Sequence, residues 1–294
     1  MLRYQADRRS IAYLITATAL LFVQWNLPTF NPFLFVFSLF MGVGVAVIAH
    51  NHNHVPMWRE RTMNILTDYW ITLFYGFPAF AWIPTHNRNH HHYNNREGDY
   101  TITYRVSERN NILTFLSYPS ISSYFQQQPI YQHLARLWQK NRQGFYIAIS
   151  QYGILGVMYI VALLIDWKKA LLYIALPHQF ALFSILIFNY VQHVHADEES
   201  EYNHSRNFVG PMLNTLLFNN GFHTIHHLRA SIHWSETPQA HEKIKHLIEP
   251  HLMEPSFWGY IFRAYIVSMI MPSKGTDSMR LARLHIQHKS SVHS

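Results

Sequence analysis

The sequence predicts an all-α integral membrane protein with four transmembrane helices arranged in two hairpins. Two observations carry this prediction. Apolar residues make up 49% of the 294 residues and charged residues only 13%, where a soluble protein usually has about a quarter charged. The apolar residues also gather in stretches of the length that crosses a bilayer.

The first hairpin joins residues 11–27 to residues 33–49 through a short uncharged link. The earlier stretch is at the lower end of the length that a transmembrane helix needs. Arg3, Arg8 and Arg9 precede it, and basic flanks favour the cytoplasmic side. No small-residue cleavage site follows the apolar run, so we expect a retained helix and not a signal peptide.

The second hairpin joins residues 145–165 to residues 170–190 through a turn at 166–169. Lys168 and Lys169 then lie outside, against the positive-inside rule, but the basic bias of the other loops is larger. With both hairpins entering from the cytoplasm, residues 50–143 and 191–294 form a cytoplasmic helical cap. We treat residues 1–294 as a single membrane domain.

Within the cap we expect segments that lie along the membrane. Residues 69–83 are apolar but interrupted by a glycine and a proline, which indicates an interfacial or re-entrant segment. Amphipathic pieces at 112–125 and 130–138 are separated by polar loops, and residues 257–271 are apolar around one arginine. Residues 285–294 read as a polar tail.

More than half of the 22 histidines lie in four short polar runs at the ends of apolar segments. The runs are HNHNH at 50–54, HNRNHHH at 86–92, NYVQHVH at 189–195 and HTIHH at 223–227. Histidines three or four residues apart share one face of a helix. Because imidazole is the commonest metal ligand near neutral pH, we expect the runs to converge on a metal site at the membrane boundary.

The remaining composition narrows the class of protein. Cysteine is absent, so a disulfide framework and thiolate metal ligands are excluded. The net charge of +7 comes from basic residues scattered among apolar segments. We therefore expect them to hold loops in the cytoplasm and not to bind nucleic acid.

The four runs resemble the histidine boxes of the membrane-bound fatty acid desaturases and their hydroxylase relatives. The resemblance rests on HxxxH at 50–54, HxxxHH at 86–91, NxxxH at 189–193 and HxxHH at 223–227, and it covers about residues 10–245. Asn220 to His223 is similar to the NxGxH entry to the last box. The first two boxes differ in spacing from many relatives, but both spacings occur in the superfamily and bear on the reaction more than on the metal.

The resemblance implies a di-iron centre that activates O2 as a co-substrate, with no further catalytic residue and no organic cofactor. Asn189 would act through a bound water. The implied ligands are His50, His54, His86, His90, His91, His193, His223, His226 and His227.

The resemblance implies a desaturase that introduces a double bond into a fatty acyl chain. A fatty-acid or carotenoid hydroxylase or ketolase, or an alkene-forming decarboxylase, would use a similar scaffold. The chain lacks an HPGG-type haem loop and a GxGxxG fingerprint, so electrons would come from a separate ferredoxin, cytochrome or reductase. A metal transporter is the alternative of another class, but it would place polar ligands along a path through the membrane. We expect the inner membrane of a bacterium or the endoplasmic reticulum of a eukaryote.

Several polar residues near the boxes need separate interpretations. His52 and His92 alternate with ligands, so we expect supporting roles away from the metal, and His195 is an alternative to His193. His178 lies in the middle of a span, where a bundle hydrogen bond and a substrate channel are equally good explanations. The histidines that we expect on the surface are His133, His204, His241, His246, His251 and those of the tail. The carboxylates near the runs that could orient metal ligands are Asp99, Asp197 and Glu198.

Overall fold

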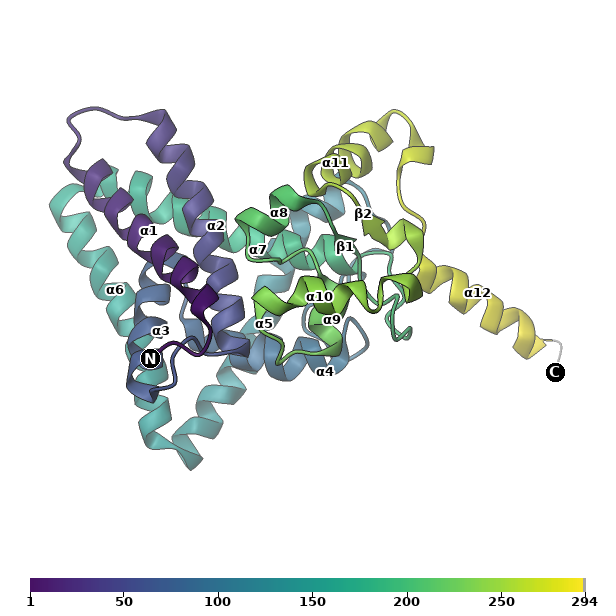
Figure 1. The fold of residues 1–294 in the computed structure, drawn as a ribbon, viewed down its shortest axis with the longest axis horizontal. Coiled ribbons are helices and arrows are strands. Elements are labelled where there is room, and N and C mark those ends of the chain that lie inside the picture. The colour runs from purple at the N-terminus through teal and green to yellow at the C-terminus, as the bar shows by residue number, and fades with distance from the viewer. Residues whose placement is uncertain (293–294) are drawn as a thin grey trace. The chain divides into compact units, whose positions relative to one another are not determined.

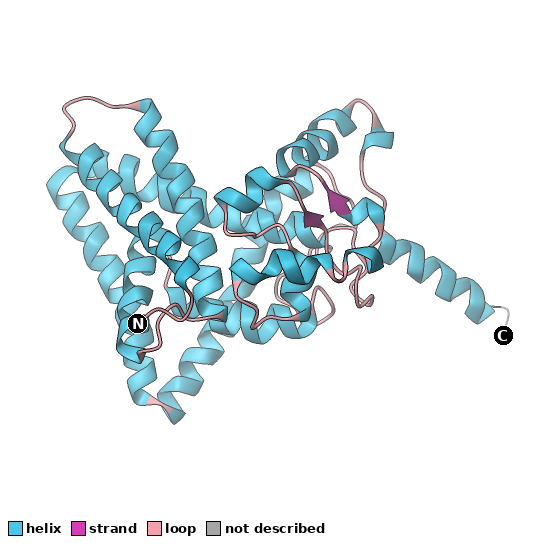
Figure 2. Cartoon of the chain, in the orientation of Figure 1, coloured by secondary structure: helices cyan, strands magenta, loops and turns pink. Residues whose placement is uncertain are grey.

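The computed structural model describes residues 1–292, and these are mostly helical with two short strands (Figures 1 and 2). The chain forms two compact units. The first unit contains residues 1–87 and 127–185, and the second unit contains residues 88–126 and 186–294. Our expectation of a single domain stays a prediction.

The first unit is built from long helices. They are α1 (Arg8–Asn26), α2 (Pro32–His54), α3 (Arg61–Tyr75) and α6 (Arg142–Ala170), followed by a π-helical segment at Leu171–Ala175 and the start of α7 (Leu176–His193). In Figure 1, α1 and α2 run side by side. Gly44 makes this possible, because a Cβ there would lie 2.8 Å from the ring of Tyr13.

Helix α2 shows how the sequence places the first histidine run. Its start is capped by Asn31, whose side chain accepts hydrogen bonds from the N–H groups of Phe33 and Leu34. The helix continues without a break from the apolar stretch to the first histidine run, and every residue from 41 to 50 is buried. His50 and His54 therefore lie one helical turn apart at its end.

Helix α3 ends where the sequence predicted an interruption. Gly76 has φ of +82°, a left-handed conformation that suits glycine, and it closes the helix by a bond from its N–H to Thr72. A Cβ at Gly76 would also lie 2.3 Å from His178. Residues Ala79–Ala81 then form a 3-10 turn, and Ile83–His90 form a π-helix that carries the second histidine run.

Two stretches of helix are long and apolar enough to cross a membrane by length and composition, Pro32–His54 and Arg142–His193. The second has 52 residues and is interrupted at Asp166, whose backbone is not helical. The Asp166 carboxylate accepts hydrogen bonds from the N–H groups of Lys168 and Lys169 and so begins the next helix. This is the turn that separates residues 145–165 from 170–190. The helix at residues 11–27 is present as α1, and four spans remain a proposal.

The second unit holds shorter elements around the end of α7. Its helices are α4 (His91–Tyr93), the first half of α5 (Ile112–Lys140), α8 (Pro211–Leu216), α9 (His223–Leu228), α10 (Thr237–Glu242), α11 (Phe257–Ile261) and α12 (Met279–Val292). Strands β1 (Asn207–Phe208) and β2 (Met253–Glu254) pair in parallel. Apart from this small pair, the described residues are mostly helical, as expected.

Two further expected segments are helical in the structure. The amphipathic pieces 112–125 and 130–138 belong to one helix, α5. Residues 285–291 are exposed, as expected of a polar tail, and they belong to α12. Arg280 and Arg283 anchor the start of α12 by pairing with Glu108, Glu198 and Asp197. Residues 293–294 of the expected tail lie outside the described residues.

Candidate metal centre

Four histidines of the second unit converge and are called the tetrad here. They come from three of the four runs: His90, His193, His223 and His227. The Nε2 atom of His193 lies 3.1 Å from Nε2 of His90 and 2.9 Å from Nε2 of His223. Nε2 of His223 lies in turn 3.1 Å from Nε2 of His227. One nitrogen of each ring therefore points to a common centre.

In two rings of the tetrad, the hydrogen bond made by Nδ1 shows which nitrogen carries the hydrogen. Nδ1 of His90 faces the Asp99 carboxylate at 2.7 Å, and Nδ1 of His193 faces the carbonyl oxygen of His204 at 3.2 Å. Both partners only accept hydrogen bonds, so each Nδ1 carries the ring hydrogen. In the neutral rings two Nε2 lone pairs then face each other, an arrangement that a cation between them stabilises.

Burial favours the neutral, metal-binding form of two members of the tetrad, because it lowers the pKa of His193 and of His227. His193 is fully buried and His90 is 1% exposed. Burial, together with the imidazoles of His91, His223, His193 and His90, lowers the pKa of His227 well below its ordinary value. A neutral imidazole offers a lone pair near neutral pH, so the donor set fits a divalent metal.

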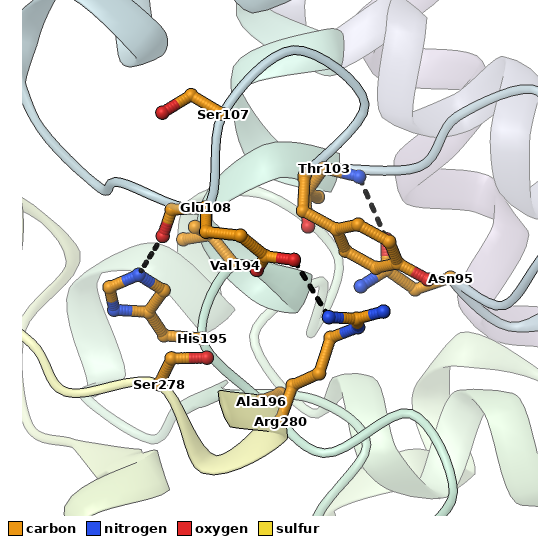
Figure 3. Close-up of a pocket in the computed structure, with 10 residues that line it drawn as sticks. Asn95, Thr103, Ser107, Glu108, Val194, His195, Ala196, Ser278 and Arg280 are labelled. Carbon is orange, nitrogen blue, oxygen red and sulfur yellow. Dashed lines mark hydrogen bonds and ion pairs between the residues drawn. The ribbon is translucent and has the colours of Figure 1, made fainter. Parts of the chain in front are cut away.

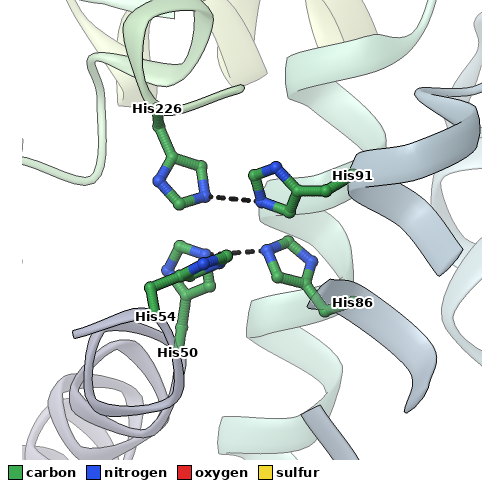
Figure 4. Close-up of side chains that lie close together, drawn as sticks. All are labelled: His50, His54, His86, His91 and His226. Atoms are coloured by element: carbon green, nitrogen blue, oxygen red, sulfur yellow. Dashed lines mark hydrogen bonds between the residues drawn. The ribbon is translucent and has the colours of Figure 1, made fainter. Parts of the chain in front are cut away.

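Three histidines of the first unit form a second group, called the triad here: His50, His54 and His86. Nε2 of His50 lies 2.9 Å from Nε2 of His86. The ring of His54 lies 4.9 Å from the ring of His50 and 5.1 Å from that of His86, centroid to centroid. Figure 4 shows these three side chains meeting at the end of α2. Trp82 packs against His50 and His86, with ring centroids 5.2 and 5.1 Å away.

His91 and His226 form a pair within the second unit. Their Nε2 atoms are 3.0 Å apart (Figure 4). The three histidines of α9 therefore belong to different groups. His223 and His227, one helical turn apart, lie in the tetrad, and His226 points to His91. All nine histidines that the sequence singled out therefore lie in histidine groups.

Asp99 is the carboxylate that orients a member of the tetrad. One of its oxygens faces His90 and accepts from the N–H of Asn95, and the other accepts from the N–H and hydroxyl of Thr101. Burial alone would raise the pKa of Asp99, but His90 and the bonds from Thr101 outweigh it and lower this pKa. Asp197 and Glu198 do not share this position, because they hold Arg283 and Arg280.

Asn189 lies one helical turn before His193 on α7. Its Nδ2 donates to the hydroxyl of Tyr118 over 2.6 Å, and this hydroxyl donates to the carbonyl of Thr101 over 2.7 Å. The chain of contacts links α7 to the loop of Asp99. Tyr118 could not be singled out from the sequence, because a lone tyrosine in an amphipathic helix resembles any packing residue.

The neighbouring histidines lie outside these groups. His52 is buried, accepts from the N–H of Met57 and has Asp68 at 3.5 Å, and His92 is exposed. His195 donates from Nε2 to the carbonyl of Glu108, in a surface pocket that Glu108 and Arg280 also line (Figure 3). Its Nδ1 faces Thr276, so both nitrogens are used by the loops around it.

His178 and three expected surface histidines have structural surroundings. Nδ1 of His178 bonds the hydroxyl of Tyr159 within the first unit. His133, His204 and His241 are buried, at 7%, 3% and 1% exposure, so their expected place on the surface was wrong. The polar residues next to these three histidines in the sequence suggest exposure, but contacts with distant segments bury them. His246 and His251 are exposed as expected.

The fold and these histidine groups define a protein with membrane-length apolar helices and sites that could hold metal ions. The sequence matches the family described as fatty acid desaturase over residues 13–258. The chain belongs to this family of membrane-associated, metal-dependent oxidoreductases that act on lipid or fatty acyl substrates. No curated protein and no solved structure matched the chain.

Proposed function

We propose that the protein is an O2-dependent di-iron desaturase that introduces a double bond into a fatty acyl chain. The observation that carries this proposal is the tetrad, in which four imidazole nitrogens face one another in a chain of the fatty acid desaturase family. Bound iron would supply the oxidising power that an unactivated methylene requires and that amino acid side chains lack.

The spacing within the tetrad supports an ion with more than four ligands. For a metal–nitrogen distance of about 2.1 Å, neighbouring ligands at right angles are ~3.0 Å apart, and tetrahedral ligands are ~3.4 Å apart. The measured separations of 2.9, 3.1 and 3.1 Å agree with right angles. Tetrahedral coordination is the usual arrangement of structural zinc, so this spacing favours an ion with more than four ligands over a structural zinc.

The ligand set is the one implied by the histidine boxes. The tetrad would hold one iron, and Asn189 would act through a water. Asp99 orients the His90 ring by its hydrogen bond, and Trp82 packs against two rings of the triad. These residues hold the ligands in place without further acid–base chemistry.

The four apolar stretches would cross the membrane as two hairpins, with the histidines on the cytoplasmic side. The two helical stretches of membrane length and the break at Asp166 support this topology. The host would be a bacterial inner membrane or the endoplasmic reticulum. A separate ferredoxin, cytochrome or reductase would deliver the electrons.

Lipid profiling tests the reaction. Cells that express the protein should gain unsaturated acyl chains, as measured by mass spectrometry after derivatisation that locates double bonds. Cells that express His223→Ala should not gain them, although the variant inserts in the membrane. If hydroxylated chains appeared in place of unsaturated acyl chains, the reaction would be a hydroxylation. If shortened terminal alkenes appeared, it would be a decarboxylation. An unchanged profile with stoichiometric zinc in the purified protein would contradict the proposal.

A further inference from the structure

His204 lies beside the tetrad without belonging to it. Only 3% of its surface is exposed, and its ring stands 5.4 Å from that of His227, centroid to centroid. Its backbone carbonyl accepts the hydrogen bond from Nδ1 of His193. His204 therefore touches two members of the tetrad, one through its ring and one through its backbone.

The two ring nitrogens of His204 have opposite surroundings. Nδ1 lies 2.9 Å from the carbonyl oxygen of Glu201 and 3.3 Å from that of Ser200. Carbonyl oxygens only accept hydrogen bonds, so Nδ1 carries the ring hydrogen and Nε2 is an acceptor. Nε2 is buried, and no donor reaches it from residues 1–292. A buried acceptor without a donor is unfavourable, and native proteins rarely leave one.

The polypeptide around Nε2 offers no replacement. The neighbouring rings of the tetrad direct their Nε2 atoms to a common centre, and Nδ1 of His193 is already used. A small molecule held at the tetrad can supply this donor, because His193 and His227 lie against His204. Water is a common additional ligand of a protein-bound cation, so an ion bound by the four imidazoles would bring such a molecule. A water on a cation is a strong hydrogen-bond donor, because the cation draws electrons from its O–H bonds.

We propose that His204 is a positioning residue of the metal centre, whose Nε2 accepts a hydrogen bond from a water ligand of the ion in the tetrad. The inference rests on the proposed metal centre and adds a residue that lies outside the four histidine runs. The hydrogen bond fixes the orientation of the water and strengthens the hold on the ion. Partners of metal ligands typically contribute about 10–100-fold to metal affinity.

Two amide substitutions separate the nitrogens of His204. In His204→Asn the amide nitrogen replaces Nδ1 and keeps the bonds to Ser200 and Glu201, but nothing replaces Nε2. In His204→Gln the longer amide reaches the place of Nε2, and its oxygen accepts there. The full-length protein is purified in detergent, freed of metal and titrated with Co²⁺ alone, which reports affinity by calorimetry and ligand geometry by visible absorption.

We expect wild type to bind two Co²⁺ ions. His204→Asn should weaken one site about 10–100-fold and change its visible spectrum, and His204→Gln should restore both towards wild type. Both metal-free variants should unfold at the wild-type temperature. Equal affinity and spectrum in wild type and His204→Asn would overturn the proposal. Equal losses in both variants with a lower unfolding temperature would also overturn it, since His204 would then be a packing residue.

Failure of the proposed metal centre has a different signature. Wild type would then bind fewer than two Co²⁺ ions, or His223→Ala would leave the titration unchanged. Either result removes the ion to which His204 is assigned, and so it overturns this inference together with the proposed function. If wild type binds two ions and His223→Ala binds one, the proposed metal centre is supported. The His204 variants can then be compared with wild type at that centre.

Discussion

The Asp99 carboxylate lies 2.7 Å from Nδ1 of His90, and both side chains are almost fully buried. The four hydrogen bonds that reach Asp99 all come from donors, namely His90, the N–H of Asn95, and the N–H and hydroxyl of Thr101. A carboxylate can accept all of them, and an amide cannot. The pair therefore fixes the His90 ring so that Nε2 is bare and faces the tetrad.

Asp99→Asn should weaken metal binding at the tetrad by about 10–100-fold, because its NH2 group would face a donor and release the His90 ring. Calorimetric titration of the metal-free protein measures the change. The matched control is Asp197→Asn, which alters an acidic residue paired with Arg283 and not with a histidine. Equal metal affinities for Asp99→Asn and wild type would remove Asp99 from the metal centre.

Arg206 should hold the end of α7 in place. It is 1% exposed, and one guanidinium nitrogen donates to the carbonyls of Val191 and Val194 at 2.7 and 3.1 Å. These carbonyls belong to the last turn that carries His193. Arg206→Met leaves them without this donor, and we expect a loss of about 2–4 kcal/mol in the free energy of unfolding, since each bond to a charged group contributes about 1.5–3 kcal/mol.

The unfolding temperature in detergent measures the effect of Arg206→Met. Arg229→Met is the control, because Arg229 is exposed. Burying a cation is itself unfavourable, so the sign of the result is informative. A higher unfolding temperature for Arg206→Met would show that the cost of burial exceeds the hydrogen bonds to α7.

Asp68 should make stability depend on pH. Burial raises the pKa of Asp68 to about 7, compared with about 3.9 in an unfolded chain. The folded protein then binds this proton more tightly than the unfolded protein between these values. Stability due to Asp68 therefore falls as the pH rises from about 4 to 7 and is constant above that range. The side chain is 25% exposed, so water screens part of the effect.

Asp68→Asn removes this titration. We expect its unfolding temperature to exceed that of wild type at pH 8 and to approach it at about pH 4, in thermal unfolding followed by circular dichroism. Asp277→Asn, an exposed site, should show no such divergence. If wild type and Asp68→Asn run parallel over the whole range, the Asp68 carboxyl is as well solvated in the folded protein as in the unfolded chain.

Much of the fold could be predicted because apolar length and helix signals are local. The break at Gly76, the turn at Asp166 and the helix that carries His50 and His54 follow from residues within a few positions. The continuity of α5 could not be predicted in this way, because the polar residues between its two amphipathic pieces also fit a loop. The π-helix at 83–90 could not be predicted either, since the spacing of His86 and His90 also fits an α-helix.

The candidate site divides in the same way. The nine histidines could be named from the spacing within the runs together with the resemblance of the runs to the histidine boxes. Asp99 was one of three carboxylates near the runs, and only the geometry separates it from Asp197 and Glu198. His204 and Tyr118 gave no signal, because their contacts with the tetrad and Asn189 depend on residues that are distant in the sequence.

The four-span topology can be mapped in a chain without native cysteine. Thr29→Cys and Glu97→Cys place single thiols at exposed positions, one in the link of the first hairpin and one in the expected cytoplasmic cap. In intact cells a membrane-impermeant maleimide should label position 29 and spare position 97, and both should react after permeabilisation. Labelling of position 97 from outside would contradict a cytoplasmic cap.

Substitution of individual histidines separates ligands from their neighbours. His223→Ala, His226→Ala and His227→Ala should each abolish turnover. Each variant removes an imidazole whose Nε2 lies 2.9 to 3.1 Å from Nε2 of another proposed ligand. Asn189→Ala should reduce turnover less, because it is proposed to act through a water and its amide contacts Tyr118.

His52→Ala and His92→Ala should keep substantial activity. His52 points to the N–H of Met57 and to Asp68, and His92 is exposed, so neither meets the triad or the tetrad. Product formed per iron bound is the measurement, since it distinguishes lost chemistry from misfolding. His54→Ala is the matched comparison for His52→Ala, because both lie in the last turn of α2. If the two lost iron equally, the end of α2 would present a different face to the metal, and the ligands of the first run would need reassignment.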